Sequence, residues 1–286
     1  MGRENEGVYA LDPPLKVMSF NVRGSFRDAR KKEAWPNRAA ANVAVIRRHA
    51  PALVGLQECQ RGNLVTYREH LPHLERVKGP PYGNTPPHDF NAILFDPRRL
   101  RFVERGRFWL SETPGRRSRS WGTRVARSAN WVLFHTDAGP LLHLNTHLDH
   151  KSAPARRNGS ALIIREIGNL LQHYGPETPV IVTGDFNCRP DSPTYQNFIN
   201  ADFVDTFLAA GNRDESGVTT FHGFKGREYR DPHPERGSRR IDWILLRNPS
   251  ARVRIISHEI LHGEADSPPY PSDHHPVLAR LVQRDP

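Results

Sequence analysis

The chain has 286 residues, 37% hydrophobic and 25% charged, which is typical of an ordinary soluble globular protein. No apolar run approaches the roughly 18 residues needed to span a bilayer, so the sequence predicts no membrane anchor. The 41 lysines and arginines outnumber the 31 acidic residues, and the net charge of +10 favours phosphate-bearing partners. Codon bias toward arginine gives the same excess, so charge alone does not choose a polymer over a small substrate.

Residues 1–14, MGRENEGVYALDPP, lack the basic start and apolar core of a secretory signal. We expect a disordered lead-in over 1–14, one domain over 15–286, a cytoplasmic location and a monomer. The two cysteines, Cys59 and Cys188, form no CxxC pair and predict free buried thiols.

Eight short segments predict buried strands, because each is rich in Val, Ile, Leu or Phe and is bounded by polar or turn residues. In chain order they are Lys16–Val22, Ala52–Gln57, Asn91–Phe95, Asn130–His135, Leu141–Thr146, Pro179–Thr183, Ile241–Leu246 and Pro276–Leu281. Helical spacing of apolar residues predicts helices over Trp35–His49 and Ala153–His173, and a shorter helix is expected after Pro193. This pattern favours an α/β fold in which two packed sheets carry helices on their outer faces.

Polar side chains stand at the ends of six predicted strands. They are Asn21, Glu58, His147 with Asp149, Asp185 with Asn187, Asp242, and Asp273 with His274. Charged groups at buried strand ends are costly unless they are paired or bind a metal. Six such placements predict that these residues converge on one site.

Phosphoester hydrolysis needs this set of groups. Carboxylate oxygens suit a hard cation such as Mg²⁺, which polarises the phosphoryl oxygen and stabilises the leaving oxygen. A further carboxylate must orient and deprotonate the attacking water, while imidazole and amide donors stabilise charge on the phosphoryl oxygens. The residue types therefore predict metal-dependent attack of water on phosphorus.

Six segments, SFNVRG, LQE, NTHLDH, GDFN, IDWIL and SDHHP, occur in this order and resemble the endonuclease/exonuclease/phosphatase superfamily. The resemblance runs from about Lys16 to Leu281. It implies a DNase I-like four-layer α/β sandwich, with two mixed sheets flanked by helices, and dependence on Mg²⁺ or Mn²⁺.

The resemblance also implies a role for each residue. Glu58 is the principal metal ligand, helped by Asn21 and Asp273 directly or through water. Asp185 positions and activates the water. Four further residues act on the phosphate or support it. The resemblance implies that Asn187 and His147 donate to the phosphate, and that His274 contacts it while Asp242 holds the imidazole. Asp149 and His150 either take part or only order the loop after His147, and His275 receives no role.

Further stretches resemble stand-alone bacterial and fungal members related to nocturnin and the deadenylases. They include FWLSETP, ANW, TTFHGF and the regions around Trp121, Arg127 and Arg156. By this resemblance, substrate binding is expected of Trp121, Arg127, Arg156 and Phe224.

Two regions could select the substrate. Residues 96–127 hold ten arginines against three acids, interleaved with Phe102, Phe108, Trp109 and Trp121. Such a mixture can follow a nucleic-acid backbone and stack bases, or it is a solvated basic surface whose aromatics lie in the core. Residues 221–240 hold six lysines and arginines with Phe224 and Tyr229, and are expected to overhang the site.

The favoured reading is a phosphatase or phosphodiesterase acting on a small phosphorylated molecule. The alternative is a DNA or RNA nuclease (an endonuclease, a 3′-exonuclease or a deadenylase-like enzyme) that uses the arginine-rich surface. A remote third reading, a non-catalytic binding protein on the same scaffold, is disfavoured because Glu58, Asp185, Asn187, Asp242 and His274 are all present.

Overall fold

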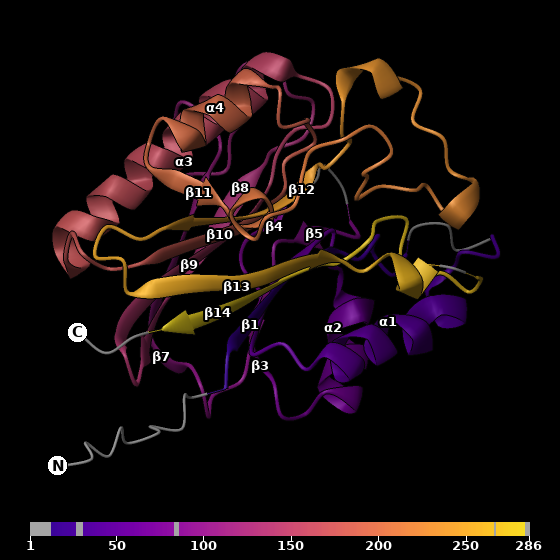
Figure 1. Cartoon of the computed structure of the whole chain (residues 1–286), viewed down its shortest axis with the longest axis horizontal. Helices are drawn as coiled ribbons and strands as arrows, with labels where there is room; N and C mark the ends of the chain where they lie inside the picture. The colour runs from indigo at the N-terminus through magenta and orange to yellow at the C-terminus, as the bar shows by residue number, and fades with distance from the viewer. Residues whose placement is uncertain (1–12, 27–30, 83–85, 266, 284–286) are drawn as a thin grey trace, which may run out of the picture.

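The structure, a computed structural model, describes residues 13–26, 31–82, 86–265 and 267–283. Residues 1–12 of the expected lead-in lie outside the described residues, and the domain boundary expected at residue 15 stays a prediction. Two six-stranded sheets pack face to face (Figure 1). In its order across the sheet, the first contains β13 (Val253–Ile260), β14 (Val277–Gln283), β1 (Leu15–Asn21), β2 (Leu53–Gln57), β6 (Ile93–Phe95) and β3 (Glu75–Val77).

Both sheets are mixed, because each contains parallel and antiparallel strand pairs. The order of the second sheet is β11 (Phe203–Asp205), β12 (Asp242–Arg247), β10 (Val180–Asp185), β9 (Gly139–His147), β8 (Ser128–Thr136) and β7 (Arg101–Trp109). A separate two-stranded pair joins β4 (Pro81–Tyr82) to β5 (Asp89–Phe90).

Helices cover the outer faces of both sheets (Figure 1). The helices are α1 (Trp35–His49), α2 (Arg61–His70), α3 (Ala153–Tyr174), α4 (Pro193–Ile199) and the short α5 (Thr206–Ala209). Three 3₁₀ turns lie in the C-terminal half: η1 (Gly226–Glu228), η2 (Pro234–Arg236) and η3 (His262–Ala265). One apolar cluster joins the first sheet to α1 and α2, one fills the space between the sheets, and one joins the second sheet to α3 and α4. This confirms the predicted four-layer α/β sandwich.

All eight predicted strands and both long helices are present, with ends shifted by a few residues. The structure adds α2, β7 and β13, among other elements that no apolar run marked. β7 and β13 are each the outermost strand at one edge of their sheet. β7 exposes most of its residues, and β13 exposes Arg254, Ile256 and Glu259. Edge strands commonly carry charged residues, because charge prevents pairing with other chains. The charged residues interrupt any apolar run, so the sequence pattern did not predict these two strands.

Strand alternation places the polar strand ends in the layer between the sheets. Side chains two residues apart share a face. In β10, Ile181 belongs to the inter-sheet cluster and Thr183 bonds Asn145, so Asp185 emerges at the end of the same face. Register then aligns Asp185 with His147 of the parallel β9 and with Asp242 of the antiparallel β12.

The sheets approach one another closely just below these polar ends. A Cβ on Gly55 would lie 2.0 Å from the Thr183 hydroxyl oxygen, so only glycine fits there. Asn145 of the second sheet donates to the Leu56 and Ala92 carbonyls of the first, and its own oxygen accepts from Gln57 at 2.7 Å. These buried bonds set the relative position of the two halves of the site.

Two further expectations can be compared with the structure. Cys59 and Cys188 are both free and buried, as predicted. Within the described part of the chain, no helix combines the length and apolar character needed to cross a bilayer.

Candidate active site

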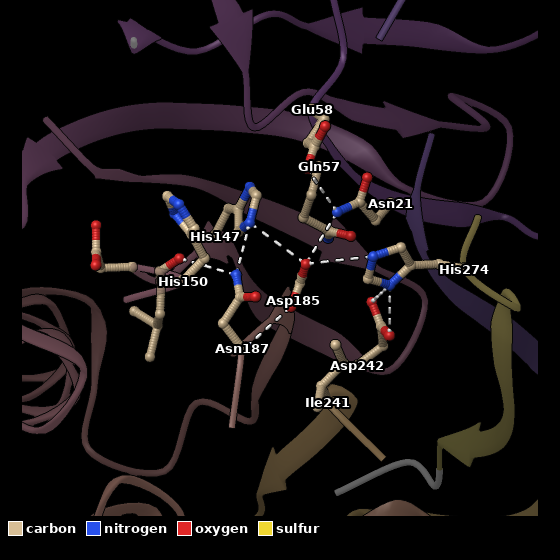
Figure 2. Close-up of polar contacts among 12 residues, drawn as sticks. Asn21, Gln57, Glu58, His147, His150, Asp185, Asn187, Ile241, Asp242 and His274 are labelled. Atoms are coloured by element: carbon tan, nitrogen blue, oxygen red, sulfur yellow. Dashed lines mark hydrogen bonds and ion pairs between the residues drawn. The ribbon is translucent and has the colours of Figure 1, made fainter. Parts of the chain in front are cut away.

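Asp185 is the centre of the site that the strand ends form (Figure 2). Its Oδ2 accepts a hydrogen bond from Asn21 Nδ2 at 2.9 Å and lies 3.3 Å from His147 Nε2 and 3.8 Å from His274 Nε2. Its Oδ1 accepts from the backbone N–H of Asn187 at 2.9 Å. Burial, with the nearby charge of Asp242, raises the pKa of Asp185 to about 7. A carboxylate of that basicity is suited to take a proton from water near neutral pH.

Asp242 and His274 form a buried ion pair beside Asp185. Nδ1 of His274 lies 2.9 Å and 3.2 Å from the two carboxylate oxygens of Asp242. Burial alone lowers the pKa of His274, but the charge and hydrogen bond of Asp242 outweigh it and raise that pKa to about 10. The imidazolium therefore directs Nε2–H toward Asp185 and the space in front of it.

His147 and Asn187 lie on the other side of Asp185 (Figure 2). Asn187 Nδ2 lies 2.9 Å from His147 Nε2 and donates to the Leu148 carbonyl at 3.1 Å. The backbone of Asn187 is left-handed, with φ of 51°. Such backbone costs of order 1–3 kcal/mol and persists where the surroundings impose it, which is common at functional sites.

Glu58, Asn21 and Asp273 come from the first sheet and face this row. Gln57 points between the sheets, so regular alternation would turn Glu58 to the opposite face. A φ of 52° at Glu58 breaks the alternation, and its Oε1 accepts from Asn21 Nδ2 at 3.3 Å. Asp273 is 4% exposed and lies 3.4 Å from the Arg23 guanidinium. The structure therefore brings together all eight predicted catalytic and metal-binding residues.

The donor set on the first sheet fits a hard divalent cation. Glu58 and Asp273 are buried carboxylates, and burial together with the charge of Glu58 raises the pKa of Asp273. Buried acids that repel one another are stabilised by a cation with oxygen preference. Asn21 differs from expectation, because its Nδ2 faces the carboxylates while its Oδ1 accepts from the Arg23 N–H at 3.1 Å. Its role as a direct ligand stays a prediction.

A second grouping could also hold a metal. Ligand atoms of Asp185, Asp242 and His274 all lie within 4.8 Å of one another. We favour the Glu58 side for Mg²⁺, because both oxygens of Asp242 already face Nδ1 of His274 and Mg²⁺ prefers oxygen ligands.

Of the predicted substrate-binding residues, Arg127 borders the site. Its guanidinium is 5.6 Å above the ring of Tyr82, which contacts His147, and its Nη2 donates to Nδ1 of His150 at 3.1 Å. Arg127 is only 6% exposed, and its Nε lies 3.9 Å from Oδ2 of Asp149.

The other three lie farther out. Arg156 donates to the Asp149 carbonyl, and the Trp121 carbonyl accepts from Ser152. Phe224 lies 5.9 Å from the Arg38 guanidinium. These contacts order the loops around the site, and substrate contact by these residues stays a prediction.

Asp149 orders the loop after β9. Its oxygens accept from the backbone N–H groups of Lys151 and Ser152 and from the Thr123 hydroxyl. Although burial opposes them, these bonds lower the pKa of Asp149. These bonds show that Asp149 orders the loop, and any further part in the reaction stays a prediction.

The two regions expected to select substrate differ in structure. Phe108 and Trp109 of the arginine-rich region are buried, so they are not available to stack bases, while Phe102 is 42% exposed on the edge strand β7. In the other region the Phe221 ring lies 5.0 Å from that of His274, and the two residues form a β-bridge. This region was expected to overhang the site, and at Phe221 it contacts the site residue His274 directly.

A cavity of about 770 Å³ lies within that second region. Its lining includes Thr219, Arg227, Tyr229, Arg230, His262 and His275. Tyr229 packs edge-on against Phe221 at 5.8 Å, and His275 directly follows His274. The cavity therefore lies next to the predicted site, one residue along the chain from His274.

Sequence reasoning missed Tyr82 and Arg23. The hydroxyl of Tyr82 contacts both His147 and the Glu58 backbone, and Arg23 pairs with Asp273. Arg23 stands two residues after Asn21, so its charge near a predicted metal ligand could have been noticed. Tyr82 lies in a proline- and glycine-rich stretch without any such signal.

Comparison with known proteins agrees with this geometry. The endonuclease/exonuclease/phosphatase family model matches residues 18–274. A mannosyl-6-phosphatase from Bacteroides thetaiotaomicron is 28% identical and has a TM-score of 0.81, with 94% of this chain and 99% of that chain covered. Among curated proteins, none matches the sequence.

Two more distant structures share the fold. The catalytic domain of human nocturnin with bound sulfate is 20% identical, with 95% of this chain and 94% of that chain covered and a TM-score of 0.73. TDP2 of D. rerio, complexed with a single-strand DNA product, is 18% identical, with 95% and 100% covered and a TM-score of 0.72. With a family match over most of its length and the strand-end site in place, the chain belongs to the endonuclease/exonuclease/phosphatase family.

Proposed function

We propose that this protein is a divalent-metal-dependent phosphoester hydrolase that acts on a small phosphorylated molecule. The observation that carries the proposal is the convergence on Asp185 of Asn21, His147, Asn187 and His274. A buried carboxylate surrounded by donors on one side and by further carboxylates on the other matches the needs of water attack on phosphorus.

The chain's own residues divide the work. Asp185 accepts the proton of the attacking water. His274, held as a cation by Asp242, donates Nε2–H to a non-bridging phosphoryl oxygen, and the side chains of Asn187 and His147 bind the phosphate from the opposite side. Glu58 and Asp273 would hold Mg²⁺ or Mn²⁺, which when bound supplies positive charge to the phosphoryl and leaving oxygens.

Two observations support a small substrate. The cavity of about 770 Å³ that Tyr229 and His275 help to line, next to His274 in the chain, is within the size range of small-molecule sites. The relative that is 28% identical is a mannosyl-6-phosphatase, so a sugar phosphate is a reasonable member of the substrate class.

A nuclease activity is the second candidate. Residues 110–127 are joined to the loop that follows His147, because the Thr123 hydroxyl bonds Asp149 and the Trp121 carbonyl accepts from Ser152. This attaches an arginine-rich loop to the site, and D. rerio TDP2 shares the fold with a DNA product bound. The burial of Phe108 and Trp109 leaves fewer stacking aromatics and disfavours it.

The test is product release by purified protein with Mg²⁺, with Mn²⁺ and with EDTA. The panel pairs sugar phosphates, nucleotides and inositol phosphates with short single-stranded DNA and RNA. We expect turnover of a small phosphate that EDTA abolishes and added metal restores. Cleavage of the oligonucleotides at low protein concentration would favour the nuclease instead, and turnover that EDTA leaves unchanged would contradict the metal requirement.

A further inference from the structure

Tyr82 lies between the two halves of the site, although no strand-end pattern marks it. It ends β4, is 1% exposed, and places its hydroxyl against one group from each sheet. The hydroxyl oxygen accepts a hydrogen bond from the backbone N–H of Glu58 at 2.9 Å. The same hydroxyl lies 3.1 Å from Nδ1 of His147.

The first bond holds the proposed metal ligand in its unusual backbone. Glu58 has φ of 52°, a conformation that costs of order 1–3 kcal/mol and persists only when its surroundings impose it. The bond from its N–H to Tyr82 satisfies a backbone donor that would otherwise be buried without a partner there. Tyr82 thereby helps to keep the Glu58 side chain on the face that Asn21 and Asp185 occupy.

The second bond holds the proposed phosphate donor. With Nδ1 of His147 against Tyr82, the other ring nitrogen faces Asp185 at 3.3 Å and Asn187 at 2.9 Å. A hydroxyl donates as well as accepts, so it keeps this ring in place in either tautomer. Burial raises the pKa of Tyr82 well above its usual value, so the hydroxyl retains its proton.

Packing alone does not require the hydroxyl. Tyr82 forms a small buried cluster with Trp109 and Ala126, and its ring lies under the Arg127 guanidinium. Phenylalanine would preserve both of these contacts. The hydroxyl is the part of Tyr82 that the apolar cluster leaves unexplained.

We propose that Tyr82 is a positioning residue whose hydroxyl couples the metal-binding half of the site to the phosphate-binding half. The inference rests on the proposed hydrolase function and deepens it. The residue acts through the Glu58 backbone and the His147 ring rather than by touching substrate.

The first experiment compares Tyr82→Phe with Tyr195→Phe. Tyr195 is a matched control because it is also buried and its hydroxyl bonds Asp205, outside the site. With p-nitrophenyl phosphate esters, loss of two buried hydrogen bonds should lower kcat about tenfold or more in Tyr82→Phe and leave KM close to that of wild type. Tyr195→Phe should leave kcat unchanged. Equal kcat for wild type and Tyr82→Phe would overturn the proposal.

A measurement of metal affinity tests the contact between Tyr82 and Glu58 without requiring catalysis. Calorimetric titration with Mn²⁺ should show weaker binding to Tyr82→Phe than to wild type or Tyr195→Phe. Unchanged Mn²⁺ affinity would remove the metal-binding half from the proposal. Because this titration needs no substrate, it stays informative even if no phosphoester in the panel is hydrolysed, which would instead contradict the proposed function.

A double-mutant comparison of kcat tests the contact between Tyr82 and His147. If Tyr82 acts on kcat through His147, Tyr82→Phe should lower kcat much less in a His147→Ala background than in wild type. The loss of Mn²⁺ affinity should persist in that background, because it runs through Glu58. A full, additive loss of kcat would show that Tyr82 does not act through His147 and would overturn the coupling.

Discussion

The residues at the strand ends differ from the loops around them. Asp185, Asp242 and His274 are each at most 5% exposed and bond one another or their neighbours directly. The loops at 110–127 and 216–240 carry exposed arginines and contact the site at several points. Arg127 and Phe221 make side-chain contacts with His150 and His274. The Thr220 hydroxyl accepts from the Asp242 N–H, and the His222 N–H donates to the Asp273 carbonyl. The buried interior holds the residues that the proposed reaction uses, whereas the exposed arginines of the loops can differ without disturbing them.

This difference separates two questions about the protein. The proposed reaction uses side chains whose positions follow from sheet register, while we expect the loops to select the substrate. Substitutions in the two regions should therefore separate kcat from KM. The predictions below proceed from the largest expected effect to the smallest.

Asp185→Asn should nearly abolish turnover. The amide keeps the shape of the side chain, although its NH2 group can no longer accept one of the two N–H hydrogen bonds that the carboxylate accepts. It cannot accept the proton of water, and loss of a general base costs about 10²–10⁴-fold in rate. Thermal unfolding should show an intact fold, because the change removes a buried charge beside Asp242. Asp191→Asn, on the exposed loop that follows the same strand, is the control and should keep full kcat. Near-wild-type kcat in Asp185→Asn would overturn the assignment of the base.

Arg127→Ala should act mainly on KM. Its guanidinium borders His147 by way of Tyr82 and His150, so its loss should remove a charge-assisted contact to substrate and raise KM about tenfold. Steady-state kinetics on the best small phosphate would measure this, with Arg116→Ala on the same loop as the exposed control. A fall in kcat as large as that of Asp185→Asn, at constant KM, would place Arg127 with the reacting groups. It would contradict the division between buried reacting residues and substrate-selecting loops.

His258→Gln should leave activity alone and change only the acid stability. His258 is buried on β13, away from the site, and burial lowers its pKa to about 3. The unfolded chain binds a proton near pH 6.5, so the stability contributed by neutral His258 is present above that pH and is lost as pH falls toward 3. Between pH 6 and 4, wild type should lose about 1.4 kcal/mol more per pH unit than the variant.

Urea unfolding at pH 7, 5 and 4 would measure that difference. His233→Gln, an exposed histidine in the 216–240 loop, serves as the control and should follow wild type. Parallel pH dependence in wild type and His258→Gln would contradict a buried neutral imidazole.

Much of the site could be predicted from strand ends. Asp185 and Asn187 follow an apolar strand, and Asp273 and His274 precede one, so each could be found without a structure. The edge strands β7 and β13 could not, because their exposed charged residues leave no apolar run. The aromatics Phe108 and Trp109 also could not be placed, since interleaving with arginine is compatible with either a stacking surface or a core.

The sequence alone determined the reaction class, the four-layer architecture and the groups that gather at the strand ends. The strand ends follow from local patterns, because alternation and strand termination act over a few residues. The four-layer architecture and the reaction class follow also from the resemblance of six ordered segments to a known family. Only the tertiary structure decided that Tyr82 bridges the two halves, that Asn21 directs its amide nitrogen at the carboxylates, and that Asp149 orders a loop. Tyr82 meets partners 24 and 65 residues away along the chain, and contacts of that separation exist only once the two sheets have packed together.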